Sequence, residues 1–409
     1  MRIAWFHSHF MHVNSGGTRL VLDYSYALQH NHGHQVTLFC DIASSEAVAQ
    51  AERCGMKLVL LDRESTNSPG YWLTLPARIR RKSAELEPVL RDYDFIINSM
   101  FPMNWLVCDF KLPKLQICYE PFAFFYDKGF LQNFKLHHQL FFRVMKLLYA
   151  GKDRDAVRKM DKVLTINKTN VPKLFEEYGI NATPLYAGID TELYKRAAAN
   201  EIEELRKKHP GFPLLFHSTD LTGIKGSYPL LEVIGELRNS YPEVKLLFTV
   251  YVNDPVGAEK FLKRISELDL RKNVEFLGCL PKEKLPLYYS SVDFVCQPSI
   301  NQPANWPLKE SLLCGTPIIA GIESEEVRDF INGCRIEVRN TNASVVKLLD
   351  LISRRNELNL TESVAELLRD FSRKSCVAQL NRMIEGMHES IFRSCAGLGV
   401  DSRKQADTV

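Results

Sequence analysis

A glutamine and a glutamate stand eight residues apart in the stretch SINQPANWPLKESLLCGTPIIAG, residues 299–321. Pro307 suits the first turn of a helix and Gly315 suits its end, so a helix is predicted between them. A capping box does not explain Glu310, because Pro307, three positions earlier, has neither a hydroxyl nor an N–H group. A carboxylate there can accept hydrogen bonds from both hydroxyls of a ribose, while free N–H groups of the first turn face a phosphate. Glu310 is therefore a candidate nucleotide ligand, and Gln302 lies in the loop that precedes this helix.

A lysine follows a predicted strand and precedes a predicted helix in LLFHSTDLTGIKGSYPLL, residues 214–231. At such a place Lys225 can neutralise a diphosphate as a point charge. The stretch is not a P-loop, because it has no G-x-x-x-x-G-K-[ST] pattern. The alternative is an exposed loop lysine that binds nothing.

Two strand ends in the first half of the chain carry further candidates. Gly16 and Gly17 precede a predicted helix, where a glycine pair lets backbone N–H groups approach an anionic or hydroxylated ligand. A simple turn is the alternative. Tyr119 and Glu120 end a strand in QICYEPFAFFYDKGF. The phenylalanines of that run are expected to form a core, but a glutamate in so apolar a run is unusual.

A D-x-D pattern, Asp153 and Asp155, could indicate a metal-bound sugar nucleotide. Its arginine neighbours favour a solvated helix face instead. His137 and His138 are adjacent, so on a helix their side chains diverge and a shared metal is not expected. No metal site is predicted.

Two basic segments fit contact with a membrane surface. One is the cluster Arg78, Arg80, Arg81 and Lys82, and the other is FKLHHQLFFRVMKLLYAG, residues 134–151. Both are basic and amphipathic, which is typical of helices at a lipid surface and equally of solvated helices over a core. The membrane interpretation is slightly favoured.

The composition is that of an ordinary globular protein, with 45% hydrophobic and 25% charged residues. A net charge of +3, from 52 basic and 49 acidic residues, does not predict a nucleic-acid partner. Ten cysteines without a C-x-x-C pair indicate free thiols in a reducing compartment. No apolar run approaches the ~20 residues of a membrane span, and the N-terminus reads as a first strand, so a cytoplasmic protein is expected.

Short apolar runs alternate with helical patterns, and the whole series restarts after a charged segment near residue 200. Such alternation predicts an α/β fold with two doubly wound, Rossmann-like domains, whose ligands lie at the carboxyl ends of the strands and so in a central cleft. The predicted domains are residues 1–195 and 196–365. Helices at 366–395 are expected to pack back towards the first domain, and the tail 396–409 is expected to be disordered.

Several segments in this order resemble glycosyltransferase family 4, the retaining, sugar-nucleotide-dependent enzymes of GT-B architecture. The similarity covers roughly residues 1–390. The segments that carry it are Gly16-Gly17, DKVLTINKTNVPKLFEEYGI followed by PLYAGIDTELY, GIKGSYPLLEVIGEL, NVEFLGCLPKEKLPLYYSSVDFVCQPS and WPLKESLLCGTPIIAG.

The resemblance implies roles for individual residues. Gly16 and Gly17 would approach the donor's phosphate or sugar, and Lys225 would bind the diphosphate. Glu310 would hold the ribose beside Leu308, another implied donor contact.

Three departures from the family pattern concern the same sites. Tyr119 occupies the position of an active-site histidine, with Glu120 next to it on the acceptor or sugar side. The paired acids E-x7-E appear as Gln302 and Glu310. The basic residue that precedes the phosphate-binding lysine is replaced by Thr219 or Asp220. A Gln amide can still bond sugar hydroxyls but lacks the strength of a charged acceptor.

These implications predict a retaining glycosyltransferase that moves a hexose from a UDP- or GDP-sugar to a glycan or lipid-linked acceptor, in surface-polysaccharide or glycoconjugate synthesis. The candidate catalytic residues are Lys225, Glu310 and Gln302. No cofactor beyond the donor is expected, and the N-terminal domain is the candidate for peripheral membrane contact. The alternative is a catalytically inactive homologue that binds nucleotide-sugar or glycan as a partner subunit.

Overall fold

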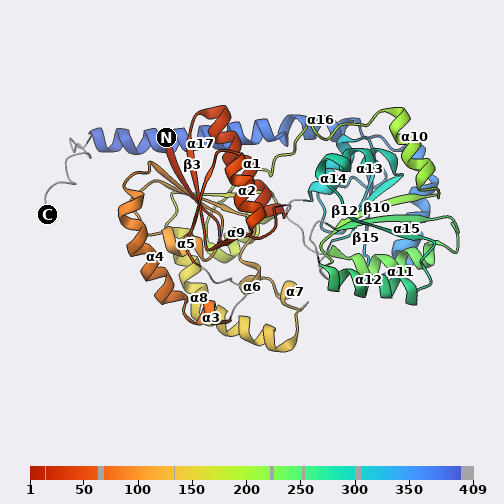
Figure 1. Ribbon diagram of the computed structural model, residues 1–409, viewed down its shortest axis with the longest axis horizontal. Helices are drawn as coiled ribbons and strands as arrows, with labels where there is room; N and C mark the ends of the chain where they lie inside the picture. The colour runs from red at the N-terminus through yellow and green to blue at the C-terminus, as the bar shows by residue number, and fades with distance from the viewer. Residues whose placement is uncertain are drawn as a thin grey trace. The chain divides into compact units, whose positions relative to one another are not determined.

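The computed structural model describes residues 1–13, 15–62, 69–132, 134–221, 225–250, 254–299 and 305–397. The chain forms two compact units, shown as ribbons in Figure 1. The first unit contains residues 1–187 and the segment that begins at Lys374, and the second contains residues 188–373.

The first unit is built on a parallel sheet of seven strands in the order β5-β3-β1-β6-β7-β8-β9. The chain starts in the middle of the sheet, winds to one edge, returns and winds to the other, as in a Rossmann-like domain. Its strands read as continuous apolar runs because helices cover both faces of a parallel sheet. Its elements are β1 (Arg2–Phe6), β2 (His9–Phe10), α1 (Gly16–His32), β3 (Gln35–Cys40), β4 (Ile42–Ala43), α2 (Ser45–Arg53), β5 (Lys57–Leu60), α3 (Pro69–Leu73), α4 (Leu75–Leu90), β6 (Phe95–Asn98), α5 (Met103–Val107), β7 (Lys114–Cys118), α6 (Ala123–Tyr126), α7 (Lys128–Leu131), α8 (Leu136–Arg158), β8 (Lys162–Thr165), α9 (Asn170–Tyr178), β9 (Thr183–Pro184) and α17 (Arg373–Gly397).

The second unit repeats this winding in a parallel sheet of six strands, β12-β11-β10-β13-β14-β15. Figure 1 shows α13 and α14 on one side of the sheet and α11 and α12 on the other. Its elements are α10 (Ala199–Lys208), β10 (Leu214–Thr219), α11 (Ser227–Leu237), β11 (Lys245–Val250), α12 (Pro255–Glu267), β12 (Val274–Cys279), η2 (Lys282–Lys284), α13 (Leu285–Ser291), β13 (Phe294–Gln297), α14 (Trp306–Leu313), β14 (Ile318–Gly321), β15 (Gly333–Ile336), α15 (Thr341–Ser353), η3 (Arg355–Glu357) and α16 (Thr361–Asp370). Two doubly wound parallel sheets confirm the predicted α/β, Rossmann-like fold class.

The segments at which the chain enters and leaves the second unit are hydrogen-bonded to each other. Ile189 forms a parallel bridge with Ser372. The Ile189 N–H donates to the Phe371 carbonyl, and the Arg373 N–H donates to the Ile189 carbonyl, both at 2.8 Å. Arg373 also pairs with the Asp190 carboxylate. The first and last residues of the second unit are thus fastened together.

The D-x-D pattern is not a solvated face throughout. Asp155 is exposed, but Asp153 is buried and accepts hydrogen bonds from the Asn104 amide at 2.7 Å and the Tyr178 hydroxyl at 2.9 Å. Burial raises the pKa of Asp153 to about 6. The predicted solvated face is therefore wrong for Asp153, which ties α8 to α5 and α9.

The basic cluster of α4 is largely neutralised inside the first unit. The buried Lys82 ammonium lies 2.6 Å from an Asp41 oxygen and 3.0 Å from an Asp62 oxygen. Arg78 donates to both oxygens of Asp62, and the Tyr71 hydroxyl donates to Asp41 at 2.6 Å. Lys82 and Arg78 therefore serve the core of the unit.

Two further expectations concern the C-terminal tail and helices that could span a membrane. The tail predicted to be disordered lies outside the described residues from position 398 onward. Among the helices that the structure describes, none combines the length and the apolar character that a bilayer span requires.

Candidate functional site

In the first unit, the loop after β7 and the start of α1 meet. The Tyr119 hydroxyl donates to the Gly17 carbonyl at 3.4 Å. A Cβ at Gly17 would lie 3.3 Å from Tyr119 Cε2, so the absence of a side chain allows this close packing. Gly16 is exposed, and a Cβ there would meet nothing within 4 Å. Of the predicted glycine pair, Gly17 alone contacts another predicted site residue.

A histidine that the sequence analysis did not single out lies against the same two residues. His7 directly follows β1, its Cε1 lies 3.6 Å from where a Gly17 Cβ would be, and its ring centre is 6.3 Å from that of Tyr119. Burial, with a smaller contribution from His9, lowers the pKa of His7 to about 3, so its imidazole is neutral at physiological pH. The buried Nδ1 has no hydrogen-bond partner among the described residues. Its position at the carboxyl end of the first strand was the available sequence signal.

Glu120, next to Tyr119, titrates near neutral pH. Burial raises the pKa of this carboxyl to about 7, Asp127 adds to the shift and Lys173 opposes it. A carboxyl with such a pKa can both take up and release a proton at the working pH of a cell. Asn170 hydrogen-bonds the Tyr119 carbonyl and so holds the backbone of this loop.

In the second unit, the loop after β13 is held between two glycines. A Cβ at Gly226, where φ is +70°, would lie 2.4 Å from the Pro298 carbonyl oxygen, and one at Gly321 would lie 2.2 Å from the Ser299 carbonyl oxygen. Any larger residue at these positions would push the loop away. Lys225 precedes Gly226 in the chain and is therefore anchored beside the carboxyl end of β13. Burial lowers the pKa of Lys225, and the nearby Asp220 acts against that shift.

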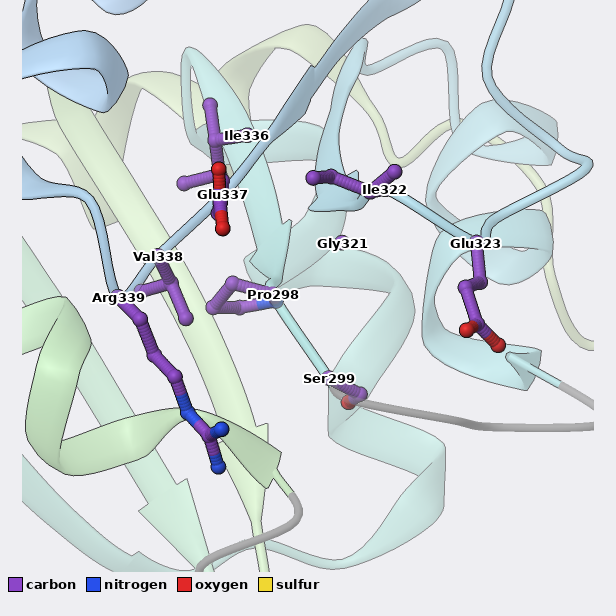
Figure 2. A pocket seen from close by; sticks show the side chains of 9 residues that line it. All are labelled: Pro298, Ser299, Gly321, Ile322, Glu323, Ile336, Glu337, Val338 and Arg339. Carbon is purple, nitrogen blue, oxygen red and sulfur yellow. The ribbon is translucent and has the colours of Figure 1, made fainter. Parts of the chain in front are cut away.

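A pocket of about 260 Å³ opens at the carboxyl ends of β13, β14 and β15. Figure 2 shows Arg339 and Glu323 on opposite sides of this pocket, with Pro298 and Gly321 between them. Ligands of open parallel sheets bind at this end of the strands. The residues that line it are Pro298, Ser299, Gly321, Ile322, Glu323, Ile336, Glu337, Val338 and Arg339.

A directed chain of hydrogen bonds supports the start of α11 beside the pocket. His217 is buried, and burial lowers its pKa to about 4, so it is neutral. Its Nδ1 lies 2.8 Å from the Cys296 carbonyl and must donate to it, which makes Nε2 the acceptor of the Ser227 hydroxyl at 2.9 Å. Ser227 then accepts the hydroxyl proton of Thr219 at 2.8 Å, and Thr219 accepts the Leu221 N–H at 2.9 Å. Every proton position in this chain is determined.

Glu310 lies inside α14, with 2% of its surface exposed, and accepts the Tyr289 hydroxyl at 3.2 Å. The helix begins at Trp306 after Asn305, whose backbone is left-handed and whose side chain makes no cap. The N-cap position belongs to Asn305, and Glu310 lies more than one turn further along the helix, so Glu310 is not a capping residue. The Leu308 side chain is fully buried, and its N–H donates to the Asn305 carbonyl at 3.1 Å, so both groups serve the helix start.

A buried ion pair next to Glu310 fixes α14 to the loop that follows β14. The Lys309 ammonium lies 3.0 Å from a Glu326 oxygen and 5.1 Å from the ring centre of Phe371. Burial alone would raise the pKa of Glu326, but the Lys309 charge and the Ser324 hydroxyl, which donates at 2.6 Å, hold it below its usual value. Gln302, the other member of the predicted pair, lies outside the described residues.

The two units thus offer different chemistry. The first places a neutral imidazole and a phenol beside a glycine, and the residue after the phenol is a carboxyl with a pKa near 7. These groups can bind hydroxyls and move protons. The second combines a lysine, a glycine-held loop and a mostly apolar pocket that Arg339 and two glutamates also line. The lysine suits an anionic group of a ligand, and the pocket suits an apolar or flat part of it.

Residues 200–367 match the family model described as Glycosyl transferases group 1. The chain is similar to D-inositol 3-phosphate glycosyltransferase of Salinispora arenicola, with 22% identity over 272 residues, which cover 62% of this chain and 59% of that protein. It is also similar to 2-deoxystreptamine glucosyltransferase of Streptomyces kanamyceticus, with 24% identity over 187 residues, which cover 44% and 47% of the two chains. The chain spans about half the length of the curated relatives it matches.

Among solved structures, HepE of Anabaena in complex with UDP is similar over 94% of this chain and 100% of that chain, with a TM-score of 0.73 and 15% sequence identity. The same protein has also been solved with UDP-glucose. At this identity the likeness concerns the fold, and it agrees with two Rossmann-like domains of GT-B architecture.

Proposed function

We propose that this protein is a retaining glycosyltransferase that moves a hexose from a UDP- or GDP-sugar to a glycan or lipid-linked acceptor, in the cytoplasm. The observation that carries the proposal is that the segment matched by the Glycosyl transferases group 1 model, residues 200–367, contains Lys225, Glu310 and the pocket of Figure 2. UDP is the first nucleotide to test, because HepE was solved with UDP.

In this proposal the donor lies at the carboxyl ends of β10, β13 and β14. Lys225 neutralises the diphosphate as it leaves, which needs no metal or other cofactor. Glu310 accepts the ribose hydroxyls, so the ribose shares with Tyr289 a carboxylate that is buried in this structure. The bond between the anomeric carbon and the diphosphate oxygen breaks, and the acceptor oxygen bonds to that carbon on the same face, which retains the configuration of the sugar. The leaving phosphate takes the acceptor's proton.

The acceptor or sugar side is assigned to the first unit. His7 supplies an unpartnered buried nitrogen, Tyr119 a phenol, and Glu120 a carboxyl with a pKa near 7. Hydroxyl groups of a sugar can both donate to and accept from such a set.

A second candidate function, that of an inactive binding subunit, has support from one part of the second unit. Thr219 or Asp220 stands where the resemblance implies a basic residue, and the hydroxyl proton of Thr219 is donated to Ser227. Lys225 thus has less help with the diphosphate than in an intact family site. A lost charged hydrogen bond is worth ~1.5–3 kcal/mol, and each ~1.4 kcal/mol is tenfold in rate, so we favour a slow enzyme over an inactive one.

The test begins with thermal-shift measurements against UDP, GDP, ADP and their hexose derivatives. A ligand at a hundred times its Kd stabilises the native state by ~2.7 kcal/mol, so the correct base raises the melting temperature. Lys225→Ala should reduce that shift strongly, and Lys260→Ala, an exposed lysine on α12, should not. Donor hydrolysis and transfer are then measured with the base that binds. Binding without turnover would contradict the enzyme and favour the inactive binding subunit. If no nucleotide binds, both proposals are wrong.

A further inference from the structure

Helix α8 of the first unit has two apolar faces, and the core accounts for one of them. Met145 and Tyr149 are buried at i and i+4, and Asp153 continues that face at i+8. A helix that packs on a globular core normally has one apolar stripe and a polar opposite face. On α8 five aliphatic side chains remain exposed, with the exposed fractions Leu136 77%, Leu140 61%, Val144 45%, Leu147 86% and Leu148 56%.

The exposed side chains form one continuous stripe. They follow Leu136 at i+4, i+8, i+11 and i+12, which places them on one side of the helix over ~18 Å. Single exposed leucines are common on protein surfaces, but a contiguous apolar stripe marks an interaction site. In Figure 1, α8 runs along the lower edge of the first unit.

The charge around the stripe has one sign. Residues 128–152 contain five Lys or Arg residues and no Asp or Glu, in a chain whose basic and acidic residues otherwise nearly balance. Lys135 and Arg143 are exposed, and neither has an ion pair among the described residues. Lys146 lies over the Tyr126 ring, 5.4 Å from its centre. An apolar stripe whose own segment, residues 128–152, carries cations and no acids is complementary to a surface that is both apolar and anionic.

We propose that the α8 face, defined as the five exposed aliphatic side chains with Lys135 and Arg143, docks on the surface of an anionic lipid bilayer. The helix lies in the plane of the interface, its leucines enter the boundary of the acyl chains, and the cations contact acidic headgroups. A second copy of this chain fits the face less well. It would bring Lys135 and Arg143 of both copies, which carry the same charge, towards each other.

This inference rests on the proposed function in one respect only, the lipid-linked class of acceptor. Such an acceptor is held at a bilayer, so docking the first unit there raises the acceptor's local concentration. The contact itself needs no turnover and is measured without it.

The experiment measures binding of the full chain to sedimented vesicles of phosphatidylcholine alone and of phosphatidylcholine mixed equally with phosphatidylglycerol. Two variants alter the α8 face: an apolar pair, Leu140→Gln with Leu147→Gln, and a charge pair, Lys135→Gln with Arg143→Gln. Matched controls remove exposed side chains of the same kind elsewhere. They are Phe175→Gln with Val346→Gln, and Lys260→Gln with Lys263→Gln.

We expect the wild-type chain and both controls to bind the anionic vesicles and not the neutral ones. The apolar pair should weaken binding on the order of tenfold or more for each leucine inserted. The charge pair should weaken it about fivefold per cation, and high salt should have a similar effect.

Equal binding to neutral vesicles, or equal binding by the α8 variants and the controls, would overturn the proposal. So would an absence of vesicle binding together with a concentration-dependent dimer that the apolar pair abolishes, since the face would then belong to a second copy. Nucleotide binding, measured in parallel by thermal shift, should be the same in every variant. If no variant binds nucleotide but the wild-type chain still binds vesicles as expected, the proposed function is wrong and the docking surface is confirmed.

Discussion

The ring of Tyr119 packs directly against the backbone of Gly17, and its hydroxyl closes the contact by donating to the Gly17 carbonyl. Two segments 102 residues apart in the chain are thereby joined at the carboxyl edge of one sheet. Tyr119, which the sequence analysis places where the resemblance implies a histidine, thus has a defined partner, and that partner is a glycine.

Gly17→Ala should therefore lower kcat/KM for the acceptor more than it lowers the stability of the fold. The new methyl group would lie 3.3 Å from Tyr119 Cε2 and 3.6 Å from His7 Cε1, so both rings must shift by a few tenths of an ångström. Overpacking costs ~1–3 kcal/mol, and the better helix propensity of alanine offsets ~1 kcal/mol of it. We expect a loss of about tenfold in kcat/KM, with the melting temperature lowered by only a few degrees.

Gly16→Ala is the matched control, because its methyl group would meet nothing within 4 Å. It should leave the packing of Tyr119 unchanged and stabilise the first turn of α1, which a raised melting temperature would show. Equal kinetic losses in the two variants would show that the effect is not contact with Tyr119.

Glu120→Gln should change how stability depends on pH. The folded protein keeps the Glu120 proton up to about pH 7, whereas the unfolded chain releases it near the ordinary glutamate pKa of 4.5. Between these values the native state binds more protons than the unfolded state, so this residue makes stability fall as pH rises. The variant cannot titrate, so its melting temperature relative to the wild type should rise across that window.

Only the difference between variant and wild type is diagnostic, because His7 acts in the opposite direction. The pKa of His7 is lowered from 6.5 to about 3, and its contribution to stability is lost as pH falls through that range. A difference curve for Glu120→Gln that is flat from pH 4.5 to 7 would contradict the raised pKa.

Tyr289→Phe and Glu310→Gln separate the structural role of Glu310 from its proposed ribose contact. The first variant removes a hydrogen bond to a charged group and should cost ~1.5–3 kcal/mol of stability, with little change in nucleotide affinity. The second should weaken UDP or GDP binding severalfold. Urea unfolding measures the stabilities, and isothermal titration measures the affinities. Unchanged affinity in Glu310→Gln would remove this residue from the donor site.

Lys82→Met should destabilise the first unit strongly, although Lys82 belongs to a segment that looks like a surface cluster in the sequence. The substitution leaves the buried carboxylate of Asp41 without its cation, which costs ~3–5 kcal/mol. The double variant Lys82→Met with Asp41→Asn should recover part of that loss. Arg80→Met, on an exposed position of the same helix, should change the midpoint of urea unfolding little.

The alternation of apolar runs was sufficient to predict two doubly wound sheets, because the hydrophobic pattern along parallel strands is local information. The capping argument for Glu310 also depended on neighbours three residues away, and α14 begins at Trp306, one residue before the predicted start. In both cases the relevant physics acts within a few residues of the chain.

The errors and omissions come from partners that are distant in sequence. Asp153 was assigned to solvent because its arginine neighbours are visible, whereas Asn104, which buries it, is 49 residues away. His7 gained its significance from Gly17 and from Tyr119, which follows β7, a strand separated from β1 by β6 in the sheet. The single sequence gives no indication of such contacts, and the burial that shifts a pKa arises only from them.

The hydrogen-bonded pair of segments at Ile189 and Ser372 means that the second unit is an insertion with adjoining ends. Its residues 188–373 form one uninterrupted stretch, whereas the first unit is made of two stretches that the insertion separates. A domain whose ends adjoin tolerates excision and circular permutation. The fragment 188–373 should therefore fold alone and unfold cooperatively, and a permuted version with Arg373 joined through a short linker to residue 188 should keep its nucleotide affinity. The fragment 1–187 lacks α17 and should not reach the stability of the intact first unit.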